Sequence, residues 1–341
     1  MIEEKNLFPM VEVLRNNHVE SLHFGSAIVI GPDKKPIFEC GDIDRLIYPR
    51  SAMKMIQAIP LLDSGAAESY TLGSEQIALS CSSHQGSILH TSLIKSWLVN
   101  LGVTEKNLLC GVQPPSDKLH RQKLRELGER PTELNNNCSG KHAGFLTYCL
   151  YHKLSLEYNN VNHPIQEEIK NTLQELSGEI IENYGIDGCS APNFMCSLRG
   201  LGSAMFRLAD SKQLGNIRAK SVSNILRSMY SFPNLVAGDG RACSELMLAA
   251  NSLTIVKTGA EGVFVAVIPE KRLGVALKIL DGSTRAAELA IASILVRLGV
   301  MAKDHPAVKK RLFCEIKNWN GQVTGLVSPT DRFWDLGKKL I

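Results

Sequence analysis

The sequence predicts an α+β fold in which one antiparallel β-sheet is flanked by helices and carries an inserted helical lobe. Three observations predict it. A β-hairpin pattern lies near the N-terminus, the middle of the chain is mostly helical in pattern, and a β-meander pattern followed by a helix lies near the C-terminus. The simplest architecture joins the two β segments into one sheet, covers one face with the terminal helix and sets the helical middle apart as a second lobe.

The β segments are recognised by alternation and by the turns between them. Residues 20–30 alternate and are rich in β-formers, and residues 36–40 form the second strand of the hairpin after a Gly-Pro-Asp turn. Near the C-terminus, turns that contain glycine separate three strand-like segments, at residues 253–257, 263–268 and 274–279. These three segments are expected to form an antiparallel meander.

The helices are recognised by their apolar spacing. Residues 51–62 have this spacing and begin just after Pro49. Residues 283–298 have it as well, and the Asp-Gly-Ser-Thr run that precedes them supplies an N-cap. Six further segments are helical in pattern: residues 87–101, 118–126, 141–152, 165–176, 198–209 and 217–230.

No internal repeat, low-complexity tract or linker divides the chain cleanly. We therefore expect a single unit over residues 1–341 with two lobes. The sheet lobe is expected from about residues 11–50 and 253–341, and the helical lobe from about residues 51–250.

Composition and charge exclude several classes of protein. The chain of 341 residues is 44% hydrophobic and 21% charged, as globular proteins are. Its net charge of +4 comes without a dense run of Lys or Arg, so no nucleic-acid partner is expected. No apolar stretch is long enough for a membrane span, and the charged N-terminus, Met1–Asn6, does not read as a signal peptide. With nine cysteines that lack disulfide spacing, these features predict a cytoplasmic protein.

A Ser-x-x-Lys pattern opens the first predicted helix. Ser51 and Lys54 are one helical turn apart, so the amine can reach the hydroxyl and act as the base that a serine nucleophile needs. The pattern alone is weak, since Ser92 and Lys95 also match it within an amphipathic helix. An N-cap serine beside a solvated lysine is the alternative interpretation of the first pair.

A Lys-Thr-Gly run at Lys257, Thr258 and Gly259 ends a later strand. Ser-x-x-Lys on a helix followed by Lys-Thr-Gly on a strand is the motif pair of serine β-lactamases and penicillin-binding proteins. The third motif of those enzymes, Ser-Asp-Asn, is absent, which disfavours a cell-wall enzyme. Lys257 could also be an ordinary lysine at a strand end.

Polar loops supply further candidates. Ser83 lies beyond the first helix, where a second active-site serine could approach, although it could equally cap the next helix. Cys138, Lys141 and Cys189 lie in two polar loops. Thiolates suit Zn²⁺, but the spacing does not demand a metal, and two unrelated buried thiols explain it as well.

Five longer strings resemble one known family, the L-asparaginase II (thermolabile L-asparaginase) family, from about Val11 to about Val300. The strings are Pro-Arg-Ser-Ala-Met-Lys at 49–54, Leu-Ser-Cys-Ser-Ser-His at 79–84, Asn-Asn-Cys-Ser-Gly-Lys-His-Ala-Gly at 136–144, Ile-Asp-Gly-Cys at 186–189 and Lys-Thr-Gly-Ala-Glu-Gly at 257–262. The family is similar in fold to serine β-lactamases and glutaminases. The resemblance therefore implies an L-asparaginase, which hydrolyses the side-chain amide of L-asparagine.

The resemblance implies two catalytic serine–lysine pairs, Ser51 with Lys54 and Ser83 with Lys257. On this basis the whole chain is expected to act as one catalytic unit. Of the two serines, Ser51 is the expected nucleophile, because it begins the helix beside Lys54; Ser83 is the rival, attacking instead or relaying protons.

The resemblance also implies one Zn²⁺ per chain, held by Cys138, Lys141 and Cys189, with substrate or water completing the shell. The zinc is expected to position substrate more than to activate water. Asp187 and His142 would orient its ligands or the substrate.

Arg50 is a candidate for binding the substrate carboxylate, since a guanidinium matches the carboxylate fork; a surface arginine is the alternative. The family resemblance further implies a homodimer. Two other functions stay open. One is an L-glutaminase or another serine hydrolase on the same fold, because one methylene gives little discrimination. The other is an amino-acid- or zinc-binding protein without turnover.

Overall fold

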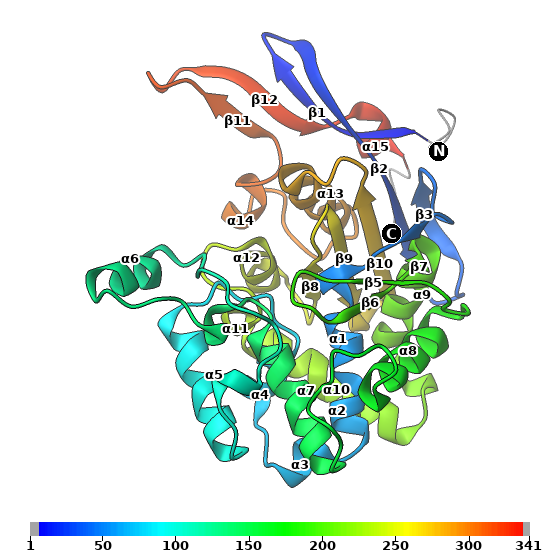
Figure 1. Ribbon diagram of the computed structural model, residues 1–341. Helices are drawn as coiled ribbons and strands as arrows, with labels where there is room; N and C mark the ends of the chain where they lie inside the picture. The colour runs from blue at the N-terminus through cyan, green and yellow to red at the C-terminus, as the bar shows by residue number, and fades with distance from the viewer. Residues whose placement is uncertain (1–6, 337–341) are drawn as a thin grey trace. The chain divides into compact units, whose positions relative to one another are not determined.

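The computed structural model describes residues 7–336 and forms two compact units (Figure 1). The first unit contains the residues up to Ala52, Cys196–Asp210 and the residues from Glu245 onward. The second contains Met53–Met195 and Ser211–Ser244. The sequence predicts that Met1–Asn6 is not part of a signal peptide. This segment lies outside the described residues.

An antiparallel sheet of eight strands forms the first unit. Seven strands follow the order β11-β12-β1-β2-β10-β9-β8, and β3 pairs with β2 beside this path. The strands are β1 (Phe8–Arg15), β2 (His18–Ile30), β3 (Pro36–Cys40), β8 (Ile255–Thr258), β9 (Val263–Ile268), β10 (Leu273–Ile279), β11 (Cys314–Lys317) and β12 (Val323–Pro329). The predicted hairpin and meander are confirmed, and the pairing of β2 with β10 joins them into one sheet as expected.

Three strands of this sheet are not predicted from the sequence: β1, β11 and β12. Pro9 interrupts the strand pattern of β1, because a proline cannot donate to a ladder. The structure accommodates it with a register shift between Pro9 and Val11. β11 is short, and none of its residues is fully buried, so it lacks the apolar alternation that reveals a strand.

The core of the first unit lies around β9 and β10. All six residues of β9 are buried, as are six of the seven in β10, so both faces of these strands are covered. Two helices of the unit pack against them, α9 (Leu198–Ala209) and α13 (Thr284–Arg297). The approach of α9 is close, because a Cβ at Gly274 would collide with the backbone nitrogen of Phe206. The sequence assigns α9 to the helical lobe, whereas its contacts place it with the sheet.

A buried guanidinium links three segments of the first unit. Arg311 is buried, and it pairs with Glu245 at 2.6 Å and with Glu288 at 3.1 Å. It also donates to the backbone oxygen of Ala307 at 2.8 Å. Arg311 therefore ties α12 (Ala242–Ala249) and α13 to the chain that precedes β11.

Removing this guanidinium is expected to destabilise the first unit. Arg311→Met leaves two carboxylates beside each other without their shared cation, which costs about 3 kcal/mol of the free energy of unfolding. The matched control is Arg272→Met, because Arg272 pairs with Asp210 while 45% of its side chain is exposed. The control is expected to cost less than about 1 kcal/mol. Urea unfolding measures the stability of both variants. If their unfolding midpoints shift equally, the buried position of Arg311 does not strengthen its ion pairs.

The second unit is helical. Its helices are α1 (Lys54–Gln57), α2 (Ile59–Asp63), α3 (Ala66–Ser69), α4 (Ser74–Ser80), α5 (Ile88–Asn100), α6 (Lys118–Glu126), α7 (Ser139–Tyr151), α8 (Pro164–Ser177), α10 (Asn216–Ser231) and α11 (Pro233–Val236). The helix predicted over residues 51–62 is divided into a 3₁₀ turn, η2 (Arg50–Met53), followed by α1 and α2. The break before α2 follows from Pro60, which cannot donate a helical hydrogen bond.

Helix α7 is the central helix of the second unit. Eleven of its thirteen residues are buried. It packs closely on α4, because a Cβ at Gly140 would collide with the backbone oxygen of Leu79 and one at Gly144 would lie 3.3 Å from Ser80. This packing brings the first turn of α7 to the end of α4, next to Ser82 and Ser83.

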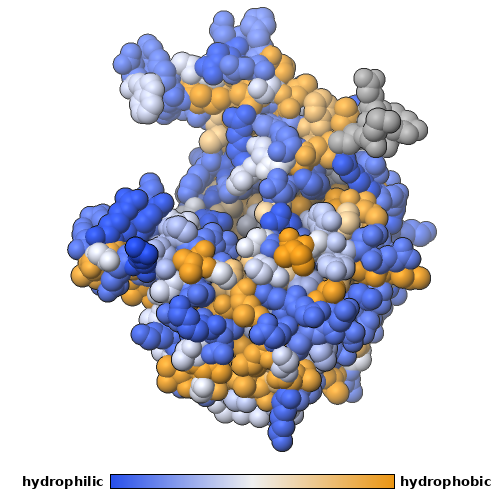
Figure 2. Space-filling model, viewed as in Figure 1, coloured by the Kyte–Doolittle hydropathy of each residue, from blue (hydrophilic) through white to orange (hydrophobic). Residues whose placement is uncertain are grey.

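Polar residues cover much of the face seen in Figure 2, with apolar patches among them, as on most globular proteins. Within residues 7–336, no helix is both long and apolar enough to span a membrane.

Candidate active site

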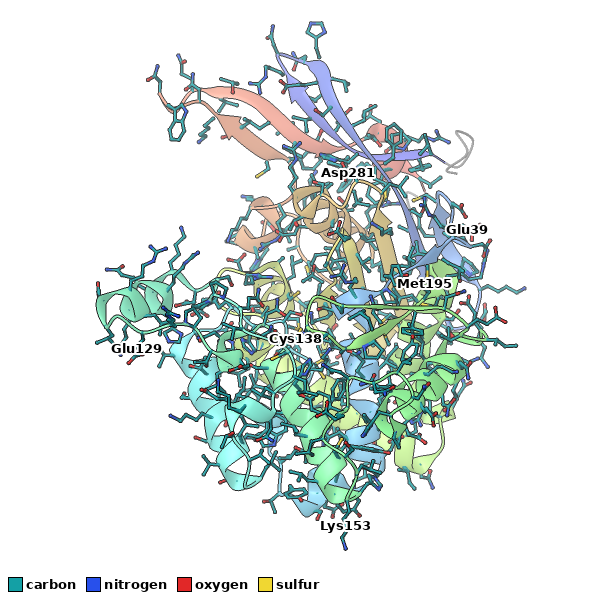
Figure 3. All side chains as sticks on the ribbon, in the orientation of Figure 1. Glu39, Glu129, Cys138, Lys153, Met195 and Asp281 are labelled. Carbon is teal, nitrogen blue, oxygen red and sulfur yellow. The ribbon has the colours of Figure 1, made fainter. Side chains whose placement is uncertain are left out.

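The first turn of α7 presents several chemical groups on one side. Cys138 precedes the helix, and its backbone N–H donates to the Asn136 side chain at 2.9 Å, which fixes the helix start. Lys141 and His142 follow one turn later, so helical geometry places them beside Cys138. All three are buried, and Figure 3 labels Cys138 in the interior of this unit.

Lys54 meets this turn from the start of α1. Its Nζ lies 3.0 Å from Ser83 Oγ and 3.0 Å from Cys138 Sγ, and it also donates to the backbone oxygen of Ser82. Only 1% of Lys54 is exposed. The structure therefore places this lysine beside Ser83, a contact that the sequence pattern does not predict. The predicted pairing of Ser83 with Lys257 stays a prediction.

A short hairpin brings in the third element of the site. Cys189 lies in the turn between β5 (Tyr184–Ile186) and β6 (Pro192–Phe194), and Lys141 Nζ donates to its Sγ at 3.1 Å. Asp187 shapes the same turn, since the Gly188 N–H donates to its carboxylate at 2.6 Å. The structure thus brings together Cys138, Lys141 and Cys189, as the family resemblance implies.

The thiols of Cys138 and Cys189 differ in pKa. The hydrogen bond with Cys189 and burial raise the pKa of Cys138 well above its usual value. The same hydrogen bond, helped by the positive charge of Lys141, holds the pKa of Cys189 well below its usual value. Burial acts to lower the pKa of Lys141, but its interactions with Cys189 and Cys138 outweigh burial and raise that pKa. Both directions favour an ammonium on Lys141 beside a thiolate on Cys189.

These donors suit a soft metal ion. Among residues 7–336, no three or more His, Cys, Asp or Glu side chains are arranged to hold a metal. Two sulfurs and the amine of Lys141 nevertheless form a buried cluster, and nitrogen and sulfur ligands are those that Zn²⁺ prefers. The ring of His142 is buried next to this cluster and interacts with Cys189. The residues present therefore fit a zinc ion.

His142 has a partner that the sequence does not reveal. Its Nδ1 lies 3.0 Å from the hydroxyl of Tyr158, which is fully buried. Burial lowers the pKa of His142 to about 4. A tyrosine in a loop before α8 carries no motif signal, so only the tertiary structure identifies it.

The remaining candidates lie in the first unit, near the end of β8. Lys257 is fully buried, and its Nζ donates to the backbone oxygen of Thr258 at 2.8 Å. The following residue, Gly259, packs against the segment from Pro49 to Ala52, because an added Cβ would lie 2.6 Å from the Pro49 oxygen. This segment carries Arg50 and Ser51. The first unit therefore brings the predicted nucleophile to the strand end that carries Lys257.

The backbone before Ser51 is strained. Arg50 has φ of 52°, in the left-handed region that residues other than glycine rarely adopt. Strain of this kind costs about 1–3 kcal/mol and is concentrated at functional sites. It therefore favours a functional role for the turn that presents Ser51.

The close approach of Gly259 to Pro49 is expected to be needed for the activity that the sequence predicts. Gly259→Ala pushes a methyl group against Pro49, so we expect the turn that presents Ser51 to shift and kcat/KM to fall about 10²-fold, the cost of a misplaced reacting group. The matched control is Gly73→Ala, whose Cβ would meet only the end of the Gln76 side chain, at 3.2 Å. Steady-state kinetics with melting curves measures both. If Gly259→Ala and Gly73→Ala have the same kcat/KM, the close approach of Gly259 to Pro49 is not needed for activity.

Comparison with solved structures finds distant similarities. Mglu in its native form aligns with a TM-score of 0.47 and 13% identity, over 82% of this chain and 66% of that one. A β-lactamase from Mycobacterium bovis aligns with a TM-score of 0.44 and 14% identity, over 81% and 95%. Simvastatin synthase from Aspergillus terreus has a TM-score of 0.40 and 9% identity, over 75% and 86%. With TM-scores below 0.5, these similarities assign no function.

Comparison with proteins of curated function gives no significant match. The comparison with family models identifies the family of this protein. Residues 11–329 match the model of the family described as L-asparaginase II, which extends the resemblance expected from the five motif strings toward the C-terminus. Because the match covers nearly the whole chain, this protein belongs to the L-asparaginase II family, and that membership supports an amidohydrolase.

Proposed function

We propose that this protein is an L-asparaginase, which hydrolyses the side-chain amide of L-asparagine to L-aspartate and ammonia through a serine activated by lysine. The observation that carries the proposal is the position of Lys54. Its buried amine lies 3.0 Å from the hydroxyl of Ser83, within the hydrogen-bond distance that a base needs to take a proton, and Lys54 follows Ser51 by three residues in the sequence. Membership of the L-asparaginase II family supports the choice of substrate.

In the proposed first step, Ser51 Oγ attacks the amide carbon of asparagine. A new C–O bond forms, and Lys54 takes the hydroxyl proton. Lys54 begins α1 three residues after Ser51, a spacing at which a lysine amine can reach a serine hydroxyl. The proton then passes to the amide nitrogen, the C–N bond breaks and ammonia leaves.

In the second step, water attacks the aspartyl ester and releases L-aspartate. Ser83, hydrogen-bonded to Lys54, relays the proton between the lysine and the reacting atoms. Lys257 supplies a second positive charge that stabilises the oxyanion. Arg50 binds the α-carboxylate of the substrate, which its guanidinium matches as a fork.

The proposed site also includes zinc. Cys138, Lys141 and Cys189 would hold the ion, since they supply a buried set of sulfur and nitrogen donors. When bound, the ion supplies a positive charge that positions the substrate. Lys141 must then give up its proton to bind, and Asp187 and His142 orient the ligands around it.

The proposal includes a cytoplasmic homodimer, as the family resemblance implies. Light scattering of the purified protein at several concentrations tests the dimer. A constant monomer mass would overturn that part of the proposal and leave the chemistry untouched.

Ammonia release by the purified protein tests the function. L-Asparagine and L-glutamine are supplied in parallel at neutral to alkaline pH. We expect strong release from asparagine and little from glutamine. Release mainly from glutamine would keep the chemistry and replace the substrate. No release from either, with folded and zinc-loaded protein, would overturn the proposal in favour of a binding protein.

A further inference from the structure

Strand β11 forms an open edge of the sheet in the first unit. It begins the strand order β11-β12-β1, and in the part of the chain that the structure describes no strand pairs with its outer side (Figure 1). The Thr324 hydroxyl on β12 donates to the Ile316 backbone oxygen at 3.3 Å, so the backbone groups of Ile316 face β12. Backbone groups alternate in direction along a strand, so those of Glu315 and Lys317 face outward.

The backbone of this edge is able to accept another strand. Many natural edges are blocked by a proline, a bulge or charged side chains. Residues 314–317 contain no proline, and the register shift next to Ile316 adds a residue to β12 rather than to β11. An extended edge of this kind can pair with a strand from another chain. Its charged side chains then decide which strand fits.

The charges on β11 match those of a second copy of β11. Glu315 and Lys317 lie two residues apart, with more than half of each side chain exposed. They pair with each other at 3.3 Å, but an exposed ion pair contributes little to stability. Two copies of one strand related by a two-fold axis pair antiparallel. An axis at Ile316 sets each Glu315 opposite Lys317 of the second copy, whereas an axis at Glu315 or Lys317 sets like charges opposite each other.

The same axis brings an exposed tryptophan toward an aromatic groove. Trp319 follows β11 and is fully exposed, more so than any other large apolar side chain within residues 7–336. Pairing about Ile316 carries it to the level of Phe313 on the second copy. Phe313 lines a groove of about 710 Å³ and packs edge to face on Trp334, with ring centroids 5.6 Å apart. Lys303 Nζ lies 4.8 Å and 5.2 Å from these two centroids, so the groove offers both stacking and cation–π contacts to a further ring.

We propose that β11 forms the dimer interface of this protein. Two copies pair antiparallel along β11 about Ile316, and Trp319 of each copy enters the groove next to Phe313 of the other. The outward backbone groups of Glu315 and Lys317 then form hydrogen bonds between the copies, and the tryptophans supply buried aromatic anchors of the kind that dominate interfaces. This proposal rests on the homodimer that the proposed function includes, but it does not depend on the hydrolysis of asparagine.

Charge variants of the full chain test the pairing of β11. Analytical ultracentrifugation measures the dissociation constant of the dimer. Lys317→Glu sets two glutamates opposite each other at two places, so we expect this constant to rise at least about 10-fold. Adding Glu315→Lys to that variant restores opposite charges and should return the constant to within about threefold of its original value. Lys34→Glu makes the same change of net charge in an exposed turn before β3, so it should leave the constant unchanged.

The variant Trp319→Ser tests the aromatic contact. We expect the dissociation constant to rise at least about 10-fold, as for the loss of a central aromatic anchor. The fold should be kept, because this side chain is fully exposed in the single chain. The matched control is Ile180→Ser, which removes an exposed apolar side chain from the second unit and should leave the dimer intact.

The outcomes separate the interface from the proposed function. If the unaltered protein sediments as a monomer at every concentration, both the homodimer and its interface are wrong. If it is a dimer that Lys317→Glu or Trp319→Ser leaves unchanged, or if the double charge variant fails to restore the dimer, this interface is overturned. If Lys317→Glu does not fold, Trp319→Ser decides. If the expected dimer forms but releases no ammonia, the interface stands and the L-asparaginase proposal fails.

Discussion

Replacing Lys54 by methionine is expected to lower kcat/KM for L-asparagine by about 10³-fold, the middle of the range for loss of a general base. Methionine fills a similar volume but has no amine, so Ser83 and Cys138 both lose their contact with Nζ. The variant should remain folded, because an apolar side chain of similar size fills the place of the buried amine without leaving a cavity. Initial rates of ammonia release and circular dichroism measure the two properties.

The chain offers a matched control for this lysine. Ser92 and Lys95 repeat the Ser-x-x-Lys spacing on α5, where both side chains are exposed. Ser92 donates only to the backbone of its own helix, at Leu89. Lys95→Met is therefore expected to change kcat/KM less than about twofold, as a change at an exposed position does. If Lys54→Met retains full activity, the base lies elsewhere and the proposed mechanism is wrong.

Replacing Cys189 by alanine is expected to abolish zinc binding. Protein purified without chelator should carry about one zinc per chain, and the variant less than about a tenth of that, because one of three protein ligands is lost. We expect KM for asparagine to rise more than kcat falls, since the zinc is proposed to position substrate. Elemental analysis and steady-state kinetics measure the two effects.

Cys149→Ala is the control for the loss of a buried thiol. Cys149 is fully buried on α7, and burial alone raises its pKa to about 12. Its variant should keep its zinc. If unaltered protein carries no zinc and retains full activity, Cys138 and Cys189 are structural thiols, and the zinc part of the proposal fails.

The sequence predicts the regular elements well where their signal is local. Helices α6 and α9 and strands β3 and β9 have the predicted bounds, because apolar spacing and turn residues determine them within a few positions. The helix predicted over 51–62 is divided in the structure, since its apolar pattern continues across Pro60 while its hydrogen bonds do not.

The candidate site is predicted less completely, because its contacts join distant segments. Motif strings locate Lys54 and Ser83, but their spacing of 29 residues says nothing about their contact. That contact depends on the packing of α4 against α7, which the small residues Gly140 and Gly144 permit. Tyr158 has no local signal at all, and only the hydrogen bonds around its hydroxyl single it out.

The proposed mechanism requires Ser51 to carry the substrate as an ester, and peptide mass spectrometry detects such an ester. Protein is mixed with L-asparagine, quenched in acid within milliseconds and digested. We expect an aspartyl ester on the peptide that contains Ser51, removable by hydroxylamine and absent from Ser51→Ala. Turnover at the usual rate with the ester on Ser83, or with no ester on either serine, would contradict it.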